Sequence, residues 1–259
     1  MKRLYVIKIG GNIIDDEQKL PSFLRNFASI SEEKILVHGG GKMATKIAEQ
    51  LNIPQQIIDG RRITDTETLK VVTMVYAGYI NKNIVAQLQA FGCNAVGFTG
   101  ADGNLMHAHK RARGEYGFAG DVDKIKTGLL TDLLEQKLTP VVAPITHDKK
   151  GQLLNTNADT VAQEIAKALS KNYGVSLIYC FEKNGVLMNA DDENSAIKQI
   201  SRNNYTELKN RNKVAGGMIP KLDNAFDAVS NGVEKVVIGQ GEHLNELIAG
   251  TSGTCIINE

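Results

Sequence analysis

Two lysines close to glycine pairs, Lys8 and Lys221, are the first candidates for chemistry. Lys8 lies near the end of an apolar run and is followed closely by two glycines. Because an ammonium group in a buried strand needs a partner, a lysine at such a strand end is well placed to meet a phosphate. Lys221 follows the sequence GGMIP, which is typical of a helix N-terminus near an anion. A strand-edge lysine and a capped surface helix are the alternative interpretations.

Amide, carboxylate and guanidinium groups stand just before two further predicted helices. Asn157 is a candidate N-cap, and Asp159 would then lie in the first turn, where it either only stabilises the helix or orients the two lysines. Asn155 is a candidate substrate contact. Arg61 and Arg62 precede the other helix, and a guanidinium binds a carboxylate in a bidentate pair. A solvated surface is the alternative for either arginine.

Glycine clusters recur at the ends of predicted strands. They are Gly10-Gly11, Gly39-Gly40-Gly41, the trio Gly97, Gly100 and Gly103, and Gly216-Gly217. Ligands of open α/β sheets bind beyond the carboxyl ends of the strands, where glycine lets backbone N–H groups approach an anion. A single pair also fits an ordinary turn, but several clusters at strand ends together indicate a phosphate site.

Two well-known phosphate motifs fit the sequence poorly. The Walker A pattern is absent, because Gly41-Lys42 is followed by methionine and lacks the upstream glycine. A loose dinucleotide pattern, Gly39-x-Gly41-x-x-Ala44, occurs with Asp59 at a suitable distance. This pattern follows the second predicted strand and leaves the other motifs unexplained, so a dehydrogenase is the weaker alternative, which NAD binding would test.

Histidines and cysteines give no sign of a metal or redox site. His107 and His109 alternate in a polar segment, but no acidic residue or cysteine stands at ligand spacing. Cys93, Cys180 and Cys255 lie far apart without CxxC spacing. A sparse, odd set of cysteines fits buried thiols in a reducing cytosol, so a cytoplasmic location is expected.

The composition is that of an ordinary globular protein. The chain has 259 residues, 42% of them hydrophobic and 23% charged, with a formal net charge of +1 and a pI near 7.7. No global charge favours nucleic acid or a membrane surface, so neither partner is predicted. The N-terminal apolar run is too short for a signal peptide, and no segment approaches the length of a membrane span.

The predicted elements alternate in a way that favours a parallel sheet covered by helices. Strands are predicted over residues 4–9, 34–37, 94–98, 139–145, 175–178, 235–238 and 254–257. Helices are predicted over residues 17–28, 43–51, 64–75, 81–91, 157–169 and 218–229. Thr64 and Glu67 have the spacing of a capping box. Residues 104–126 predict hairpins. A turn is predicted at Asn184-Gly185, followed by the apolar segment 186–188 and then an exposed stretch to about residue 212.

Nine stretches, in order along nearly the whole chain, resemble the amino acid kinase family, in particular its members that phosphorylate N-acetylglutamate in arginine biosynthesis. They are KIGGNII (8–14), VHGGGK (37–42), GRRIT (60–64), GFTGADG (97–103), GFAGD (117–121), PVVAPI (140–145), LNTNADTVA (154–162), AGGMIPK (215–221) and GTCI (253–256). The resemblance implies an α/β fold, a three-layer αβα sandwich with a mostly parallel open sheet. Residues 1–172 would form a lobe for acylglutamate binding and dimerisation, and residues 173–259 a lobe for ATP, with one continuous sheet.

The resemblance also implies a role for each motif residue. The catalytic residues would be Lys8, Lys221 and Asp159. The acylglutamate would contact Gly40, Gly41, Arg62 and Asn155. The nucleotide would contact Gly10, Gly11, Phe181, Gly185, Gly217 and Met218. The cofactors would be ATP and Mg²⁺, with the metal held mainly by the ATP phosphates and no metal ligand supplied by the protein.

The chemistry implied by the resemblance agrees with this set of residues. The reaction would be ATP-dependent phosphorylation of the side-chain carboxylate of N-acetylglutamate. A carboxylate nucleophile is already ionised at pH 7, so no general base is required. Positioning and charge stabilisation remain, and two lysines, aligned amides and Mg²⁺ suit that task.

Two segments depart from the family pattern and leave alternatives open. The stretch CFEKNGVL (180–187) stands where relatives usually have an aspartate-containing turn, which leaves the adenine and ribose contacts undetermined. Lys42 stands where proline is common, and its charge would suit a more acidic acyl group, so N-succinylglutamate is an alternative acceptor. Two further alternatives remain. One is another carboxylate or carbamate kinase of the same fold, and the other is a non-catalytic nucleotide-binding regulator.

The start of the first strand bears on the assembly. Family members that arginine inhibits carry an extra N-terminal helix that joins dimers into hexamers. The first predicted strand of this chain begins almost at Met1. The resemblance therefore implies a homodimer that arginine does not inhibit.

Overall fold

The computed structural model describes residues 1–259 except 59–60, 190, 194, 211–217 and 258–259. Its main sheet has eight strands in the order β12-β14-β13-β11-β1-β2-β8-β5. Their bounds, in that order, are Gln199–Ile200, Thr254–Ile256, Lys235–Gln240, Tyr173–Phe181, Lys2–Ile9, Glu33–His38, Thr139–Val142 and Ala95–Phe98. Neighbouring strands are parallel except β13 and β14, so the predicted mostly parallel open sheet is confirmed.

Both faces of the central strands are buried, as expected for a parallel sheet. In β1, Leu4 and Val6 pack into one hydrophobic cluster, whereas Tyr5, Ile7 and Ile9 pack into the other. This alternation follows from the two-residue period of a strand.

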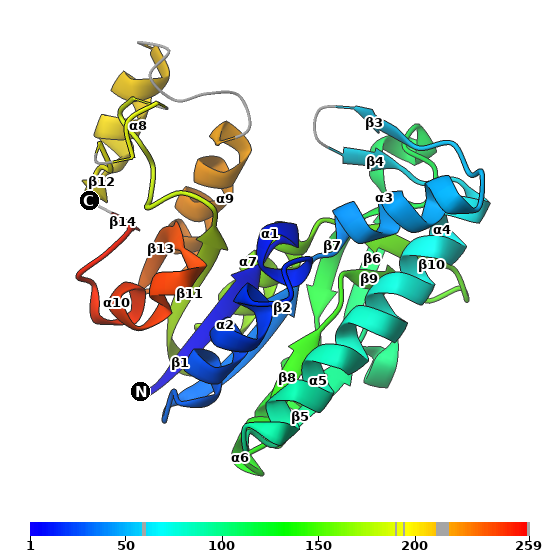
Figure 1. The fold of residues 1–259 in the computed structure, drawn as a ribbon, viewed down its shortest axis with the longest axis horizontal. Helices are drawn as coiled ribbons and strands as arrows, with labels where there is room; N and C mark the ends of the chain where they lie inside the picture. The colour runs from blue at the N-terminus through cyan, green and yellow to red at the C-terminus, as the bar shows by residue number, and fades with distance from the viewer. Residues whose placement is uncertain (59–60, 190, 194, 211–217, 258–259) are drawn as a thin grey trace.

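Helices cover the two faces and complete the three layers (Figure 1). The cluster that includes Leu4 and Val6 also contains residues of α6 (Thr127–Glu135), α7 (Ala158–Leu169), α8 (Arg202–Asn210) and α9 (Ile219–Ser230). The opposite cluster contains residues of α1 (Gly11–Ile14), α2 (Lys19–Ala28), α3 (Gly41–Gln50), α4 (Thr66–Thr73), the π-helix η1 (Met74–Ile80), α5 (Asn81–Ala90) and α10 (Leu244–Ala249). The predicted three-layer αβα sandwich is therefore confirmed.

Two smaller sheets flank the main one. Strands β10 (Leu153–Thr156), β7 (Ala119–Ile125), β6 (Met106–Lys110) and β9 (Ile145–His147) close on one another. The antiparallel pair β6 and β7 confirms the hairpin predicted within residues 104–126. The hairpin of β3 (Gln56–Ile58) and β4 (Arg61–Ile63) lies near α3, at the end of the molecule opposite β13 and α10 (Figure 1).

Some sequence predictions were wrong in detail. The cap of α4 is Asp65, whose carboxylate accepts a hydrogen bond from the Thr68 amide, so the proposed box from Thr64 does not form. The strand predicted over residues 139–145 is divided between β8 and β9. The helix α8 was not predicted within the stretch expected to be exposed, although most of its residues are exposed. Within the described ranges, no helix combines the length and apolarity needed to cross a bilayer.

Candidate functional site

Lys8 and Asp159 form a largely buried ion pair between β1 and α7. Lys8 lies two residues after Val6 and therefore on the same face of the sheet as α7. Its Nζ lies 2.7 Å from Oδ1 of Asp159, and the two side chains are only 10% and 13% exposed. The predicted partnership of these two residues is thus observed, and it satisfies the ammonium group inside the fold.

The start of α7 places Asp159 through the predicted cap. The side-chain oxygen of Asn157 accepts hydrogen bonds from the amides of Asp159, at 2.8 Å, and Thr160, at 3.2 Å. Asn157 is therefore the N-cap, and Asp159 lies in the first turn, where the helix dipole favours a negative charge. Tyr179 of β11 donates a hydrogen bond to the Asp159 carbonyl oxygen at 3.1 Å, which joins this turn to the sheet.

Lys221 reaches the same place from the first turn of α9. Burial raises the pKa of Asp159, but the positive charges of Lys8 and then Lys221 outweigh it and hold that pKa below its usual value. Burial lowers the pKa of Lys221, which Asp159 partly offsets. Both lysines thus favour the ionised form of the same carboxylate.

The aromatic ring of Phe181 contacts both ammonium groups. Nζ of Lys221 lies 3.4 Å from the ring centroid, and Nζ of Lys8 lies 5.7 Å from it. An aromatic face attracts cations at such distances. Sequence reasoning placed Phe181 beside the nucleotide and missed this contact, because nothing in the pattern CFEKNGVL shows which way the ring points.

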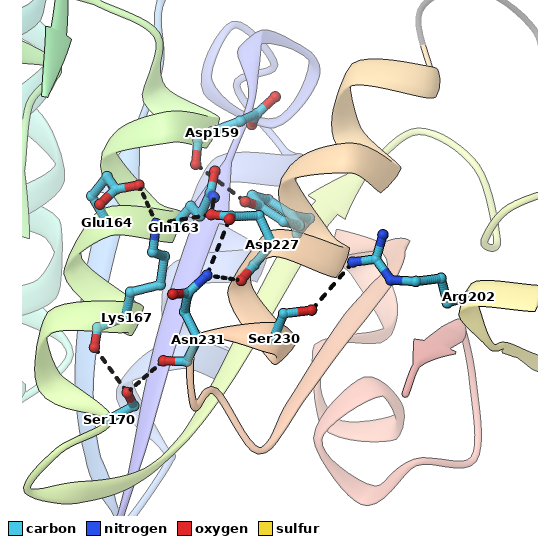
Figure 2. A network of polar contacts seen from close by, with 10 residues as sticks. Asp159, Gln163, Glu164, Lys167, Ser170, Arg202, Asp227, Ser230 and Asn231 are labelled. Carbon is cyan, nitrogen blue, oxygen red and sulfur yellow. Dashed lines mark hydrogen bonds and ion pairs between the residues drawn. The ribbon is translucent and has the colours of Figure 1, made fainter. Parts of the chain in front are cut away.

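A polar network holds α9 against α7 (Figure 2). The carboxylate of Asp227 on α9 accepts hydrogen bonds from Gln163 and from Lys167, the latter at 2.8 Å. Residues 159, 163 and 167 are four apart, so they form one stripe along α7 that faces α9. The contacts that join the two helices therefore continue the stripe on which Asp159 lies.

A cavity of about 330 Å³ opens beside the ion pair. Of the predicted site residues, it is lined by Lys8, Gly40, Gly41, Arg62, Asn155 and Asp159. Lys42, Thr45, Tyr76 and Arg111 also line it, although sequence reasoning assigned none of them to the site except Lys42, which was named as a departure. Lys42 and Thr45 belong to α3, directly after the glycine loop, so the predicted loop and helix already place them near the site. Tyr76 and Arg111 reach the cavity from η1 and from between β6 and β7, a placement that no local sequence pattern specifies.

The guanidinium of Arg62 is held in this cavity by uncharged oxygens. It donates to the Gly41 carbonyl at 3.0 Å and to Oγ1 of Thr45 at 2.7 Å, and it also donates to Gln55. These partners fix the side chain without neutralising it, which suits a carboxylate ligand. Asn155 lies nearby, and its amide donates to Oγ1 of Thr64 at 3.0 Å.

The glycine loop after β2 has no room for side chains. Gly40 has a φ of 148°, and a Cβ there would lie 2.3 Å from Cδ1 of Ile80. Gly40 is the N-cap of α3, so the first amides of that helix stand at the cavity. Free amides at a helix N-terminus suit an anion.

The residues predicted to contact the nucleotide are only partly brought together. A Cβ on Gly10 would lie 3.6 Å from Nζ of Lys8, so this glycine adjoins the lysine. Gly11 begins α1, and Met218 is the residue just before α9. Gly185 packs against Thr254, where a Cβ would lie 2.6 Å from Oγ1, so its small size also has a structural explanation. Gly217 lies outside the described residues, as does Asp59 of the dinucleotide alternative.

The histidines and cysteines show no metal cluster in the part of the chain that the structure describes. His107 hydrogen-bonds Asn104 at 2.5 Å and lies edge-on to His147. No group of three or more His, Cys, Asp and Glu side chains among the described residues could hold a metal ion. Cys93 and Cys180 are buried free thiols, and Cys255 is partly exposed.

The fold and the site together define a class of protein. The chain belongs to the amino acid kinase family, whose sequence profile matches residues 3–240. Membership of this family identifies the chain as a kinase, which uses ATP as the phosphoryl donor.

Individual relatives are close in both sequence and structure. The chain is 57% identical to the acetylglutamate kinase of Cytophaga hutchinsonii over 251 residues, which cover 96% of this chain and 95% of that protein. It is 52% identical to the acetylglutamate kinase of Parabacteroides distasonis over 248 residues, 95% and 97% of the two chains. The solved structure of smu.665 from Streptococcus mutans UA159 has a TM-score of 0.81 at 27% identity, covering 98% of each chain. Carbamate kinase from Giardia lamblia has a TM-score of 0.75 at 14% identity, covering 100% and 99%, which shows the fold alone.

Proposed function

We propose that this chain transfers the γ-phosphoryl group of ATP to the side-chain carboxylate of N-acetyl-L-glutamate, giving N-acetylglutamyl 5-phosphate and ADP in arginine biosynthesis. The observation that carries the proposal is the convergence of Lys8 and Lys221 on the Phe181 ring, with Lys8 paired to Asp159 beside the cavity that contains Arg62. The acceptor follows from the acetylglutamate kinases to which the chain is similar along nearly its whole length.

The reaction requires little covalent chemistry from the protein. An oxygen of the acceptor carboxylate forms a bond to the γ-phosphorus while the bond between that phosphorus and the bridging oxygen of ADP breaks. No proton moves, because the carboxylate is already ionised at pH 7. The protein must therefore hold two anions together and stabilise the charge of the moving phosphoryl group.

The described residues suit these two tasks. Lys8 and Lys221 supply positive charge from β1 and α9, and Asp159 orients Lys8 through the 2.7 Å contact. Arg62 and Asn155 would hold the acylglutamate, and the amides of Gly40 and Gly41 would face its reacting carboxylate or the phosphate. Gly10, Gly11, Phe181, Gly185, Gly217 and Met218 remain proposed nucleotide contacts.

We propose that Mg²⁺ is held mainly by the phosphates of ATP, whose negative charge it would partly neutralise. The described residues supply no cluster of three or more metal-binding side chains. Mg²⁺ often keeps several waters and binds through substrate phosphates, so such a cluster is not required. The fit rests on two lysines with only one carboxylate, Asp159, between them and on the helix N-terminus, which together suit a polyphosphate.

The remaining assignments concern the whole chain. We propose that residues 1–172 bind acylglutamate, because the residues lining the cavity all lie there. We propose that residues 173–259 bind ATP, because Phe181 and Lys221 reach the ion pair from that part. A homodimer in the cytoplasm is proposed from the family resemblance.

Measuring ADP release with N-acetylglutamate, N-succinylglutamate and free glutamate side by side tests the function. We expect N-acetylglutamate to have the highest kcat/KM, and hydroxylamine to trap the acyl phosphate as a hydroxamate. The succinyl compound belongs in the panel because Lys42 lines the cavity and its side chain is 69% exposed. ATP binding without ADP release for any acceptor would favour the non-catalytic regulator instead.

A further inference from the structure

Two fully buried polar side chains lie directly behind the glycine loop. His38 is the last residue of β2 and is 0% exposed, and Asn81 is the first residue of α5 and is 1% exposed. Nδ2 of Asn81 lies 3.1 Å from Nε2 of His38. Neither side chain lines the cavity. Burying a polar group costs free energy unless the group is hydrogen-bonded, so the partners of these two side chains are informative.

The contacts of Asn81 determine its amide orientation. Oδ1 accepts a hydrogen bond from Nζ of Lys82 at 3.1 Å, and Nδ2 donates to the Val141 carbonyl at 3.0 Å. The reverse orientation would place the amide oxygen against that carbonyl and the amide nitrogen against the ammonium group. The second hydrogen on Nδ2 is then donated to Nε2 of His38.

The tautomer of His38 follows from this donor. Since Nε2 accepts a hydrogen bond, the proton of the neutral ring is on Nδ1. Nδ1 lies 2.9 Å from the carbonyl oxygen of Gly39, so it donates to that oxygen. Burial lowers the pKa of His38 to about 4, which is consistent with a neutral ring at pH 7.

This hydrogen bond determines the direction of the next amide group. In a trans peptide the C=O and the N–H point in opposite directions, and the described residues contain no cis peptide. When His38 holds the Gly39 carbonyl, the N–H of Gly40 is therefore directed away from the imidazole. The cavity is lined by Gly39, Gly40 and Gly41.

We propose that His38 and Asn81 form a clamp that fixes the Gly39–Gly40 peptide and keeps the Gly40 N–H directed at the anion in the cavity. Both are positioning residues, since they act through the backbone and do not touch the substrate. The inference deepens the proposed phosphoryl transfer and rests on it, because it assigns the Gly40 N–H to the charge of the phosphoryl group or its acceptor.

The packing around the clamp supports it independently. Directly before Asn81, the π-helix η1 presses Ile80 and Tyr76 against Gly40, where a Cβ would lie 2.3 Å and 3.0 Å from their nearest atoms. Gly97 leaves the space that Asn81 fills, because a Cβ there would lie 1.9 Å from Oδ1. This strand-end glycine thus makes room for the clamp and need not bind phosphate itself. Single π-helical turns are often found at functional sites.

Two substitutions, each of which replaces one ring nitrogen of His38 by an amide group, separate its two hydrogen bonds. The amide nitrogen of His38→Asn takes the place of imidazole Nδ1 and keeps the donor to Gly39, but loses the contact with Asn81. The longer His38→Gln keeps a partner for Asn81 at the place of Nε2 and loses the donor to Gly39. If the clamp operates, kcat falls about tenfold more in His38→Gln than in His38→Asn. This difference is smaller than the effect of removing a preorganised donor, because the Gly40 N–H itself remains. The melting temperatures and the KM for the acceptor should be similar in the two variants.

A second measurement does not depend on activity. In ¹⁵N NMR spectra of the wild-type protein, the shifts of the His38 ring nitrogens should show a neutral ring protonated on Nδ1. The amide resonance of Gly40 should also move when MgADP or the non-hydrolysable analogue AMP-PNP is added with N-acetylglutamate.

The outcomes that overturn the clamp differ from those that overturn the proposed function. Protonation on Nε2 of His38, or equal kcat for the two variants at equal stability, contradicts the clamp. Wild-type protein that binds nucleotide, shows the Nδ1 tautomer, yet phosphorylates none of the acceptors would leave the geometry intact and contradict the proposed function.

Discussion

At the residue scale, the site contains more positive than negative charge. Lys8 and Lys221 approach one carboxylate, Asp159, and Arg62 adds a further cation whose hydrogen-bond partners are uncharged. A buried site with an excess of positive charge favours anionic ligands, because they supply the missing negative charge. We therefore propose that Asp159 keeps the two lysines together until the phosphate binds.

Removing either lysine should abolish most of the rate. We expect Lys8→Ala and Lys221→Ala to lower kcat by roughly 10²–10³-fold, the scale of one lost preorganised donor. Lys8→Ala should also destabilise the fold more, because it leaves the buried Asp159 without its 2.7 Å partner. The exposed Lys46→Ala serves as the control in the same steady-state assay. Unchanged kcat in folded Lys8 and Lys221 variants would refute the role assigned to both.

The buried His38 predicts a specific pH dependence of stability. Its pKa is about 4 in the folded chain against an ordinary 6.5, so between these values the unfolded state binds more protons. Stability should therefore decrease as pH falls from 6.5 to 4, by on the order of 3 kcal/mol. Above pH 6.5 this contribution is constant.

Urea unfolding at several pH values measures this effect. The gap in unfolding free energy between wild type and His38→Asn should shrink over that range, because asparagine does not titrate. His109→Asn, at an exposed position of β6, is the matched control. Parallel stability curves for wild type and His38→Asn would contradict the prediction.

At the element scale, sequence predicted most strands and helices but not the geometry that joins them. The apolar run around Lys8 and the cap at Asn157 are local patterns, so β1 and α7 could be predicted. The pairing of Lys8 with Asp159 is not local, and it was implied by the family resemblance. The π-helix η1 could not, because it continues directly from α4 into α5 and has no sequence signal of its own. The contact of Phe181 with the lysines was also missed, since a strand-end aromatic residue has no preferred partner in sequence.

The link between α7 and α9 should affect the rate as well as the stability. Asp227→Ala removes the acceptor shared by Gln163 and Lys167 (Figure 2). Helix α9 should then be held less firmly against α7, and Lys221, which lies on α9, should be positioned less precisely. We expect a loss of about 1 kcal/mol in unfolding free energy, because the pair is partly solvated, and a several-fold decrease in kcat.

Asp223→Ala provides the comparison on the same helix. Asp223 accepts a hydrogen bond from Tyr205 of α8 at 2.7 Å, so it joins α9 to a different neighbour. Its loss should cost similar stability while leaving kcat closer to wild type. Equal decreases in kcat for the two variants would mean that the α7–α9 contacts have no special influence on Lys221.

At the scale of the whole molecule, one sheet brings distant parts of the chain to the same place. Strand β1 pairs with β11 on one side and with β2 on the other, so the ends of these strands are neighbours. Lys8, Phe181 and the glycine loop after β2 are therefore adjacent because of strand order, although they are far apart in sequence. The glycines at successive strand ends predicted a ligand site at this edge of the sheet, but not the place of Phe181 in it.

The proposed homodimer requires a surface whose apolar residues would be covered. Met74 and Tyr79 of η1 are 58% and 63% exposed, and the i→i+5 bonding of a π-helix brings residues five apart to similar sides. Such exposed apolar groups suit an interface between two copies. We expect wild-type protein to have the mass of a dimer by light scattering, with or without arginine.

Charged substitutions on this surface should separate the subunits without unfolding them. Met74→Glu and Tyr79→Glu place carboxylates where an apolar contact would otherwise form, so the dissociation constant should rise and the mass should fall toward that of a monomer at low concentration. Leu51→Glu, at a position 53% exposed beyond the end of α3, is the control. A stable dimer in both η1 variants would place the interface elsewhere, and a hexameric wild type would contradict the proposed assembly. Because the π-helix also presses on Gly40, the monomeric variants should be assayed for kcat, which tells whether dimer contacts support the glycine loop.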